Sequence, residues 1–192
     1  MHQSLPPSNG FIEQKLCLTC GLCCNGVIFA DVQLQAGDDP RRLSALGLVL
    51  NTTIGKRTQT FAQPCVSLDG CRCRIYAERP QYCRQFECLL LKEVKAGRIT
   101  TPTALRIITT ARERAALVRS LLGDLGDTEE TLSLAARFRK TSRRMEKCGL
   151  DKATAEIYGN LTLAMQDLNY LLQEAFYSHG SAIGPQGFDG TS

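Results

Sequence analysis

The chain has 192 residues, of which 43% are hydrophobic and 22% are charged, and it contains no run of about 18 apolar residues. These values argue against a membrane span and a wholly disordered chain, and a chain of this length buries enough surface to fold without cross-links. The formal net charge of +4 counts each cysteine as neutral. Eight thiolates on two divalent ions would cancel it, so the charge is weak evidence for nucleic acid, and we expect no nucleic-acid or membrane partner.

The two ends of the chain are polar and rich in Gly, Ser or Pro. We expect residues 1–10 and 179–192 to be flexible tails. The first of them has no basic segment followed by an apolar one, so it does not read as a secretory signal. We therefore expect a cytoplasmic protein whose thiols are kept reduced.

Short elements are predicted between residues 11 and 97. The β-branched residues of 27–34 predict a strand, and 56–61 is its candidate partner in a small hairpin. An Asp-Pro pair predicts the start of a short helix over 39–48, and a proline in the first turn predicts a helix over 80–95.

Three longer helices are predicted after residue 100. The first spans 101–122, and its apolar side collects Ala104, Ile108, Ala111, Ala115, Val118 and Leu122. The second spans 127–147 and begins with Asp127 and Glu130 as a capping box. The third follows Asp151 and carries an apolar seam at steps of three and four: Ile157, Leu161, Ala164, Leu168, Leu171 and Ala175.

These patterns predict a mainly α fold in two parts. An irregular, metal-stabilised, cysteine-rich module with a small β-hairpin would occupy 11–97, packed on a helical part of about three helices over 101–178. The apolar seam is expected to pack in the core, with a protein partner on the helical part as the alternative. Basic residues of the second helix, including Arg137, are interpreted as a solvated face, with an RNA or acidic-partner surface as the alternative. Arg112 and Arg119 are expected to be half-buried, reaching solvent or pairing with Asp or Glu.

Ten cysteines give the strongest chemical signal, and four of them stand within eight residues: Cys17, Cys20, Cys23 and Cys24. A C-x-x-C step places two sulfurs around one ion on a single turn, and Gly21 supplies the backbone freedom that the loop needs. Such spacing in a reduced chain indicates metal ligands rather than disulfides. Because neighbouring side chains diverge, we expect Cys23 and Cys24 to serve two metals, or one to bind a metal while the other packs.

Five further cysteines are spaced too widely for one local knuckle: Cys65, Cys71, Cys73, Cys83 and Cys88. We expect them to converge on the first group across the fold. On a single helix, Cys83 and Cys88 would point well apart. Cys148 is a lone thiol at a helix end and is not expected to be a ligand. Removing it, together with either Cys71 or Cys88, leaves eight cysteines, which is enough for two four-cysteine sites or for one four-thiolate cluster with four to spare.

The ligand chemistry is expected to be all sulfur, because both histidines, His2 and His179, lie in the tails. Soft thiolates select zinc, iron–sulfur or copper(I). The C-x-x-C-x-x-C spacing is also that of ferredoxin loops. Three arginines could donate hydrogen bonds to the sulfurs of such a cluster: Arg72, Arg74 and Arg84. The alternative is that these arginines form a solvated face. No Cys-Pro follows the loop, however. Zinc ions are therefore our first expectation, and an iron–sulfur cluster is the alternative.

Three segments together resemble a known family: C-x-x-C-G-x-C-C over 17–24, C-x-x-L over 65–68, and C-x-I-Y-x-x-R-P-x-x-C-R-x-F over 73–86. They are similar to the bacterial CxxCxxCC (YkgJ-like) family of zinc- or iron-chelating domains. The similarity covers roughly 16–88 and carries over to Cys17, Cys20, Gly21, Cys23, Cys24, Cys65, Leu68, Cys73, Ile75, Tyr76, Arg79, Pro80, Cys83, Arg84 and Phe86. Cys71 is an addition to the pattern and Cys88 is loosely matched, so we take Cys88 as the eighth ligand.

The resemblance implies metal binding and brings no established catalytic residue. No phosphate loop, dinucleotide motif, nucleophile elbow or histidine base is present, so any enzymatic activity would have to use the metal itself. We expect a metal-binding protein whose ligands are Cys17, Cys20, Cys23, Cys24, Cys65, Cys73, Cys83 and Cys88. The alternative is an iron–sulfur enzyme or accessory subunit for electron or methyl transfer.

Overall fold

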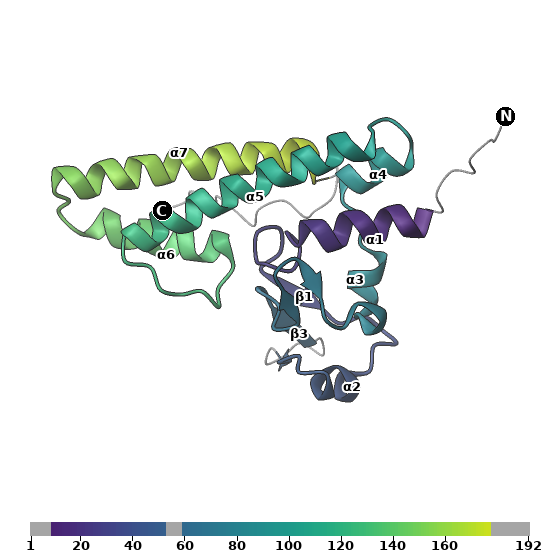
Figure 1. Cartoon of the computed structure of the whole chain (residues 1–192). Helices are drawn as coiled ribbons and strands as arrows, with labels where there is room; N and C mark the ends of the chain where they lie inside the picture. Colours follow the sequence, from purple (N-terminus) through teal and green to yellow (C-terminus); the bar gives the residue numbers. More distant parts are fainter. Residues whose placement is uncertain (1–8, 53–58, 178–192) are drawn as a thin grey trace.

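Helices make up most of the structure, a computed structural model that describes residues 9–52 and 59–177 (Figure 1). In chain order its elements are α1 (Asn9–Cys20), β1 (Asp31–Gln33), α2 (Pro40–Ala45), β2 (Asn51–Thr52), β3 (Gln59–Ala62), β4 (Leu68–Asp69), β5 (Arg72–Cys73), the 3-10 turn η1 (Tyr76–Glu78), α3 (Gln81–Gln85), α4 (Leu89–Lys95), α5 (Thr101–Asp124), α6 (Leu134–Lys147) and α7 (Lys152–Ala175). The mainly α fold predicted from the sequence is confirmed. The expected tails lie outside the described residues, except that positions 9 and 10 begin α1.

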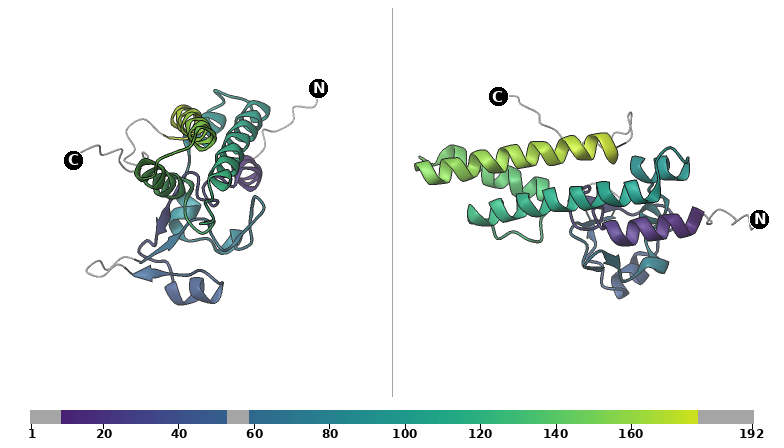
Figure 2. Two further views of the ribbon diagram at one scale, coloured as in Figure 1. Left: turned by 90° about the vertical axis from the view of Figure 1, so that its left-hand side faces the viewer. Right: turned by 45° about the horizontal axis from the view of Figure 1, so that its top comes forward.

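The long helices α5 and α7 lie side by side and form an elongated layer, with α6 packed on α5 near its C-terminal end (Figure 1). Helices α1 and α4 pack against the N-terminal half of α5. Figure 2 shows the strands and α2 on one side of this layer, beyond α1. The cysteine-rich part is thus attached to one end of the helical layer.

Helix α5 follows the sequence pattern closely. The Thr100 hydroxyl caps it by accepting the Thr103 N–H, and Pro102 lies in its first turn. All six apolar residues predicted for its inner side are buried: Ala104, Ile108, Ala111, Ala115, Val118 and Leu122. A good cap and a continuous apolar stripe at helical spacing therefore fix both the helix and the face that it buries.

Helix α7 also begins where the sequence predicts. The carboxylate of Asp151 accepts the Thr154 N–H at 2.9 Å and caps the helix. Its buried side consists of Leu161, Ala164, Met165, Leu168 and Leu172. Leu171, predicted as part of the seam, is partly buried and packs against the same core, and Leu172 beside it is fully buried.

The start of α6 differs from the prediction. The cap is Ser133, whose hydroxyl accepts the Ala136 N–H at 3.4 Å, and the helix begins seven residues later than the predicted Asp127. Asp127 instead forms a buried ion pair with Arg137, with 2.6 Å between Oδ2 and Nε. The interpretation of Arg137 as part of a solvated face is therefore wrong, because its guanidinium is buried in an ion pair with the carboxylate of Asp127.

The predicted antiparallel pairing is confirmed between β1 and β3, in which buried Val32 lies opposite buried Phe61, but α2 and β2 separate these strands in the chain, so the pair is not a hairpin. Positions 56–58 of the predicted second strand lie outside the described residues. A third strand, β2, joins the other edge of β3. With only two residues it has no alternation that a sequence pattern could reveal. Helix α2 begins at Pro40 behind the cap Asp39, as predicted.

The helix predicted over 80–95 is in fact two helices, α3 and α4. Phe86 and Cys88 have extended backbones, with ψ angles of 123° and 162°, and they separate the two. Phe86 packs edge-on against Phe29, with 4.8 Å between ring centroids, which explains why the chain leaves the helix there. Cys88 therefore stands at the start of α4, and the prediction that it shares a helix with Cys83 is wrong.

One apolar core runs through both halves of the chain. It joins Leu16 and Leu22 beside the first cysteines with Leu91 of α4, Ile108 of α5 and Phe176 at the end of α7. A second, smaller core lies between the sheet and α2: Val32, Leu34, Leu43, Leu48 and Phe61. The cysteine-rich part is thus attached to the helices by a packed interface. Within the described residues, no helix is long and apolar enough to cross a membrane.

Candidate metal centre

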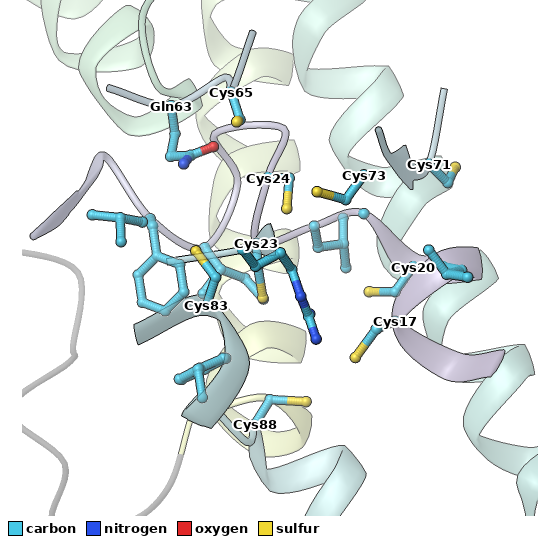
Figure 3. Close-up of a pocket in the computed structure, with 18 of the residues that line it drawn as sticks. Cys17, Cys20, Cys23, Cys24, Gln63, Cys65, Cys71, Cys73, Cys83 and Cys88 are labelled. Atoms are coloured by element: carbon cyan, nitrogen blue, oxygen red, sulfur yellow. The ribbon is translucent and has the colours of Figure 1, made fainter. Parts of the chain in front are cut away.

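Nine of the ten cysteines line one cavity between α1, the strands and the start of α4: Cys17, Cys20, Cys23, Cys24, Cys65, Cys71, Cys73, Cys83 and Cys88 (Figure 3). All ten thiols are free, and each of these nine is partly buried. Apolar side chains supply most of the remaining wall, including Leu22, Phe61 and Phe176. All eight predicted ligands are therefore brought together, and Cys148 is exposed and outside the cavity.

The first group of thiols sits where α1 ends. Cys17 and Cys20 lie in its last turn, and Gly21 follows with a φ of +68°. A β-carbon on Gly21 would lie 3.2 Å from the Cys71 Cα, so both the backbone angle and the close approach call for glycine. The Gly21 carbonyl then accepts the N–H of Cys24 at 3.0 Å, which turns Cys23 and Cys24 back into the cavity.

The second group is held against the first by backbone contacts. The Cys65 N–H donates to the Cys24 carbonyl at 2.8 Å. Cys73 lies opposite Leu68 in the β4–β5 pair, which folds the loop back onto Cys65. Cys83 comes from α3, and Cys88 from the cap position of α4. Residues that are far apart in sequence thus converge through a hairpin and a helix break.

The nearby sulfur charges divide the eight predicted ligands into two sets. Besides burial, the sulfurs that raise the pKa of Cys23 are, in decreasing order, those of Cys20, Cys88, its chain neighbour Cys24 and Cys17. Those that raise the pKa of Cys24 are Cys83, Cys65 and Cys73. Figure 3 shows the same grouping: the Cys88 sulfur points toward Cys17 and Cys20, whereas Cys24, Cys65 and Cys73 gather on the other side. We call Cys17, Cys20, Cys23 and Cys88 the first set, and Cys24, Cys65, Cys73 and Cys83 the second set.

Burial shapes the acidity of these thiols. It is the main cause that raises the pKa of Cys20, Cys24 and Cys83 to about 12, and it also raises the pKa of Cys23 well above that of an ordinary thiol. Neighbouring sulfur charges add to the effect. Without a positive ion between them, these groups therefore stay protonated at neutral pH. A bound cation would supply the charge that makes the thiolates stable.

Several sulfurs already face backbone donors, however. The N–H of Leu22 lowers the pKa of Cys20, and those of Leu91 and Leu90 lower the pKa of Cys88 at the start of α4. Both the backbone and the hydroxyl of Ser67 do the same for Cys65. Donors aimed at sulfur stabilise the thiolate over the thiol, as the donors around metal ligands do.

The second set has, in addition, a cation beside it. Arg79 lines the cavity and lowers the pKa of both Cys24 and Cys83. Its guanidinium lies 3.7 Å from the centroid of the Tyr76 ring, and its Nε donates to the Tyr76 carbonyl at 3.2 Å. Arg79 is therefore held in place next to the sulfurs, where it can offset the net negative charge of a metal ion with four thiolate ligands.

The arginines singled out from the sequence behave differently. Arg74 donates to the Val66 carbonyl at 2.6 Å, and its charge lowers the pKa of Cys65. Arg72 and Arg84 are exposed. Arg112 and Arg119 of α5 donate to the carbonyls of Thr19 and Asn25, at 3.3 and 3.1 Å. The expected carboxylate partners are therefore replaced by the backbone around the first cysteines, and Arg112 is exposed rather than half-buried.

The sulfurs lie in one cavity, but they are not close enough together to coordinate a metal ion. In the stretches 9–52 and 59–177, no group of three or more Cys, His, Asp or Glu side chains is drawn tightly enough around one point to hold an ion as it stands. Closing either set around a metal requires the thiol side chains to move together. The donor chemistry fits a soft metal, because each set offers four sulfurs.

Sequence reasoning did not identify Gln63, a fully buried polar residue in the wall of the cavity (Figure 3). It also missed the roles of Ser67 and Arg79 beside the sulfurs. The Arg-Pro of the family pattern gave a hint for Arg79, but no motif distinguishes Gln63 or Ser67.

Comparison with known proteins agrees with this picture. Residues 16–104 match the family model CxxCxxCC, described as "Putative zinc- or iron-chelating domain". The match runs from the end of α1 to the first turn of α5 and contains the whole cavity-lining cysteine group. No curated protein and no solved structure matches the chain. The part of the chain that builds the cysteine cavity is therefore similar to the CxxCxxCC domains, which are described as zinc- or iron-chelating.

Proposed function

We propose that this protein binds two metal centres through eight cysteine thiolates, one centre in each set. The observation that carries the proposal is the division of Cys23 and Cys24, two adjacent residues, between two groups of sulfurs. Four thiolates are the complete ligand shell of a structural zinc ion. Cys71 lies beside Cys20 but belongs to neither complete set, and Cys148 is remote.

Zinc is the first candidate for both centres. Four thiolates leave no open position on zinc, so the ions would stabilise the fold rather than catalyse a reaction. The elements beside the cavity support this role, because β5, which carries Cys73, and its partner β4 have two residues each and can contribute little stability of their own. A bound structural metal supplies folding free energy that such short elements lack.

An iron–sulfur cluster is the second candidate, and the composition of the first set favours it there. Cys17, Cys20 and Cys23 belong to one C-x-x-C-x-x-C run, and the remote Cys88 completes the four. This pattern is typical of cluster loops, and the apolar wall would keep water away from the sulfurs. Such a cluster would make the protein an electron-transfer or group-transfer component, including methyl transfer.

Metal analysis of the full chain, purified without oxygen, tests the proposal. Two zinc ions per chain and no colour would support the zinc centres. Iron with acid-labile sulfide in a brown protein would support the cluster. The proposal is wrong if the reduced protein binds neither metal nor cluster after reconstitution. Cys148→Ser is the matched control, because that thiol is exposed and should not alter the metal content.

A further inference from the structure

Gln63 is a polar residue whose burial in the wall of the cavity the proposed metal ligands do not explain. Its side chain is 2% exposed and lines the cysteine cavity, two residues before Cys65. Its Oε1 atom is buried without a hydrogen-bond partner among the described residues. Buried amide oxygens are almost always satisfied, so an orphaned one calls for an explanation in the chemistry of the cavity.

The backbone on both sides holds Gln63 in this place. Its N–H donates to the Ala30 carbonyl at 2.9 Å, at the end of the β1–β3 pairing. Two residues on, the Cys65 N–H donates to the Cys24 carbonyl at 2.8 Å. The amide therefore lies where the second set is assembled, and Figure 3 shows its oxygen on the side that faces Cys65 and Cys24.

A thiolate changes what this amide must do. An amide oxygen facing a negatively charged sulfur is repelled, because both atoms are acceptors. Rotation of the amide by half a turn exchanges Oε1 and Nε2 with almost no change of shape, and it directs an N–H at the sulfur. Cys65 already receives hydrogen bonds from Ser67, whereas the group that lowers the pKa of Cys24 is the charged Arg79. Cys24 is thus the sulfur with the greater need of a donor.

We propose that Gln63 is a positioning residue of the second set, whose side-chain amide turns on metal binding and donates an N–H to a thiolate there, that of Cys24 or of Cys65. This inference rests on the proposed metal-binding function. Residues that hydrogen-bond to metal ligands typically raise metal affinity by about 10- to 100-fold. Gln63 would act in this way through the sulfur, without touching the ion.

Substitution tests the role through affinity. Gln63→Met keeps the length of the side chain but removes the N–H, so one of the two centres of the full-length protein should bind zinc about 10- to 100-fold more weakly. Gln63→Glu keeps the shape and should weaken that centre at least as much, because a carboxylate only accepts hydrogen bonds. Gln85→Met, at an exposed position of α3, is the matched control and should bind zinc like the unmodified protein.

A measurement on the unmodified protein gives a readout that packing alone would not change. In protein loaded with ¹¹³Cd, the Gln63 side-chain amide proton should shift downfield and show scalar coupling to one cadmium nucleus through the N–H···S bond. The resonance is assigned by its loss in Gln63→Met, or by selective labelling if that variant is insoluble. Absence of the shift and coupling in loaded protein would overturn the role of Gln63, as would wild-type zinc affinity in Gln63→Met. Failure of the unmodified protein to bind zinc or cadmium at all would instead refute the metal-binding function.

Discussion

Replacing Cys88 by serine tests the assignment of the first set most directly. Cys88 stands at the start of α4, where the N–H groups of Leu91 and Leu90 stabilise its thiolate. A neutral serine hydroxyl in its place would leave three thiolates for the first centre. Because the second set contains none of the same sulfurs, the metal content should fall from about two ions per chain to about one, rather than to zero.

The assay is zinc content per chain in protein loaded to saturation and freed of weakly bound metal, with Cys71→Ser and Cys148→Ser treated in parallel. Cys71→Ser should keep both ions, although Cys71 lies beside Cys20 in the cavity wall. The loss of one structural ion removes folding free energy on the order of 10 kcal/mol, so Cys88→Ser should also melt at a clearly lower temperature. If Cys88→Ser kept two ions while Cys71→Ser lost one, the division into sets would be refuted. If Cys88→Ser were insoluble, the Cys71→Ser result alone would decide.

Three further changes have defined outcomes. Removing metal with a strong chelator should abolish the protease protection of the cysteine-rich part. Much of the helical circular dichroism should remain, because α5 and α7 pack mainly on each other. Unchanged protease protection in verified metal-free protein would contradict this expectation. In the same metal-free protein, burial raises the pKa of Cys20, Cys24 and Cys83 to about 12, above that of an unfolded thiol. The unfolded chain then loses protons first, so the free energy of unfolding in urea should decrease as the pH rises above about 9, and an increase would count against the burial of these thiols. Asp127→Ala leaves the buried Arg137 unpaired and should cost about 3–5 kcal/mol, or roughly 6–20 °C in melting temperature, whereas a variant that replaces both residues with apolar ones should recover much of the loss.

The long helices could be predicted because their sequence signals are redundant. In α5 the cap, the first-turn proline and a six-residue apolar stripe all agree. Where a local sequence signal competes with a tertiary contact, the prediction of the element boundary was wrong. Asp127 and Glu130 form a plausible capping box, but Asp127 is used by Arg137, a tertiary contact that no local pattern contains. The break between α3 and α4 likewise depends on the packing of Phe86 against Phe29, far away in sequence.

The candidate site was likewise predictable from the sequence only in part. The eight cysteines could be selected from their spacing and from the family resemblance, and the structure brings all of them to one cavity. Their division into two sets could not be derived from spacing, because it depends on the hairpin that returns Cys73 to Cys65 and on the helix break that frees Cys88 from α3. Gln63 carries no motif at all, and only its burial identifies it.

The peptide bond between Cys23 and Cys24 has a thermodynamic consequence for the proposed pair of centres. Adjacent Cα atoms are held about 3.8 Å apart, so neither sulfur can be fixed without restricting the other. The first ion to bind would therefore bear most of the cost in chain entropy of ordering the turn after α1. The second ion would meet a segment that is already ordered, and its apparent affinity would be higher for that reason alone. Two centres joined in this way fill cooperatively, so that at limiting metal the population divides into empty and doubly loaded molecules.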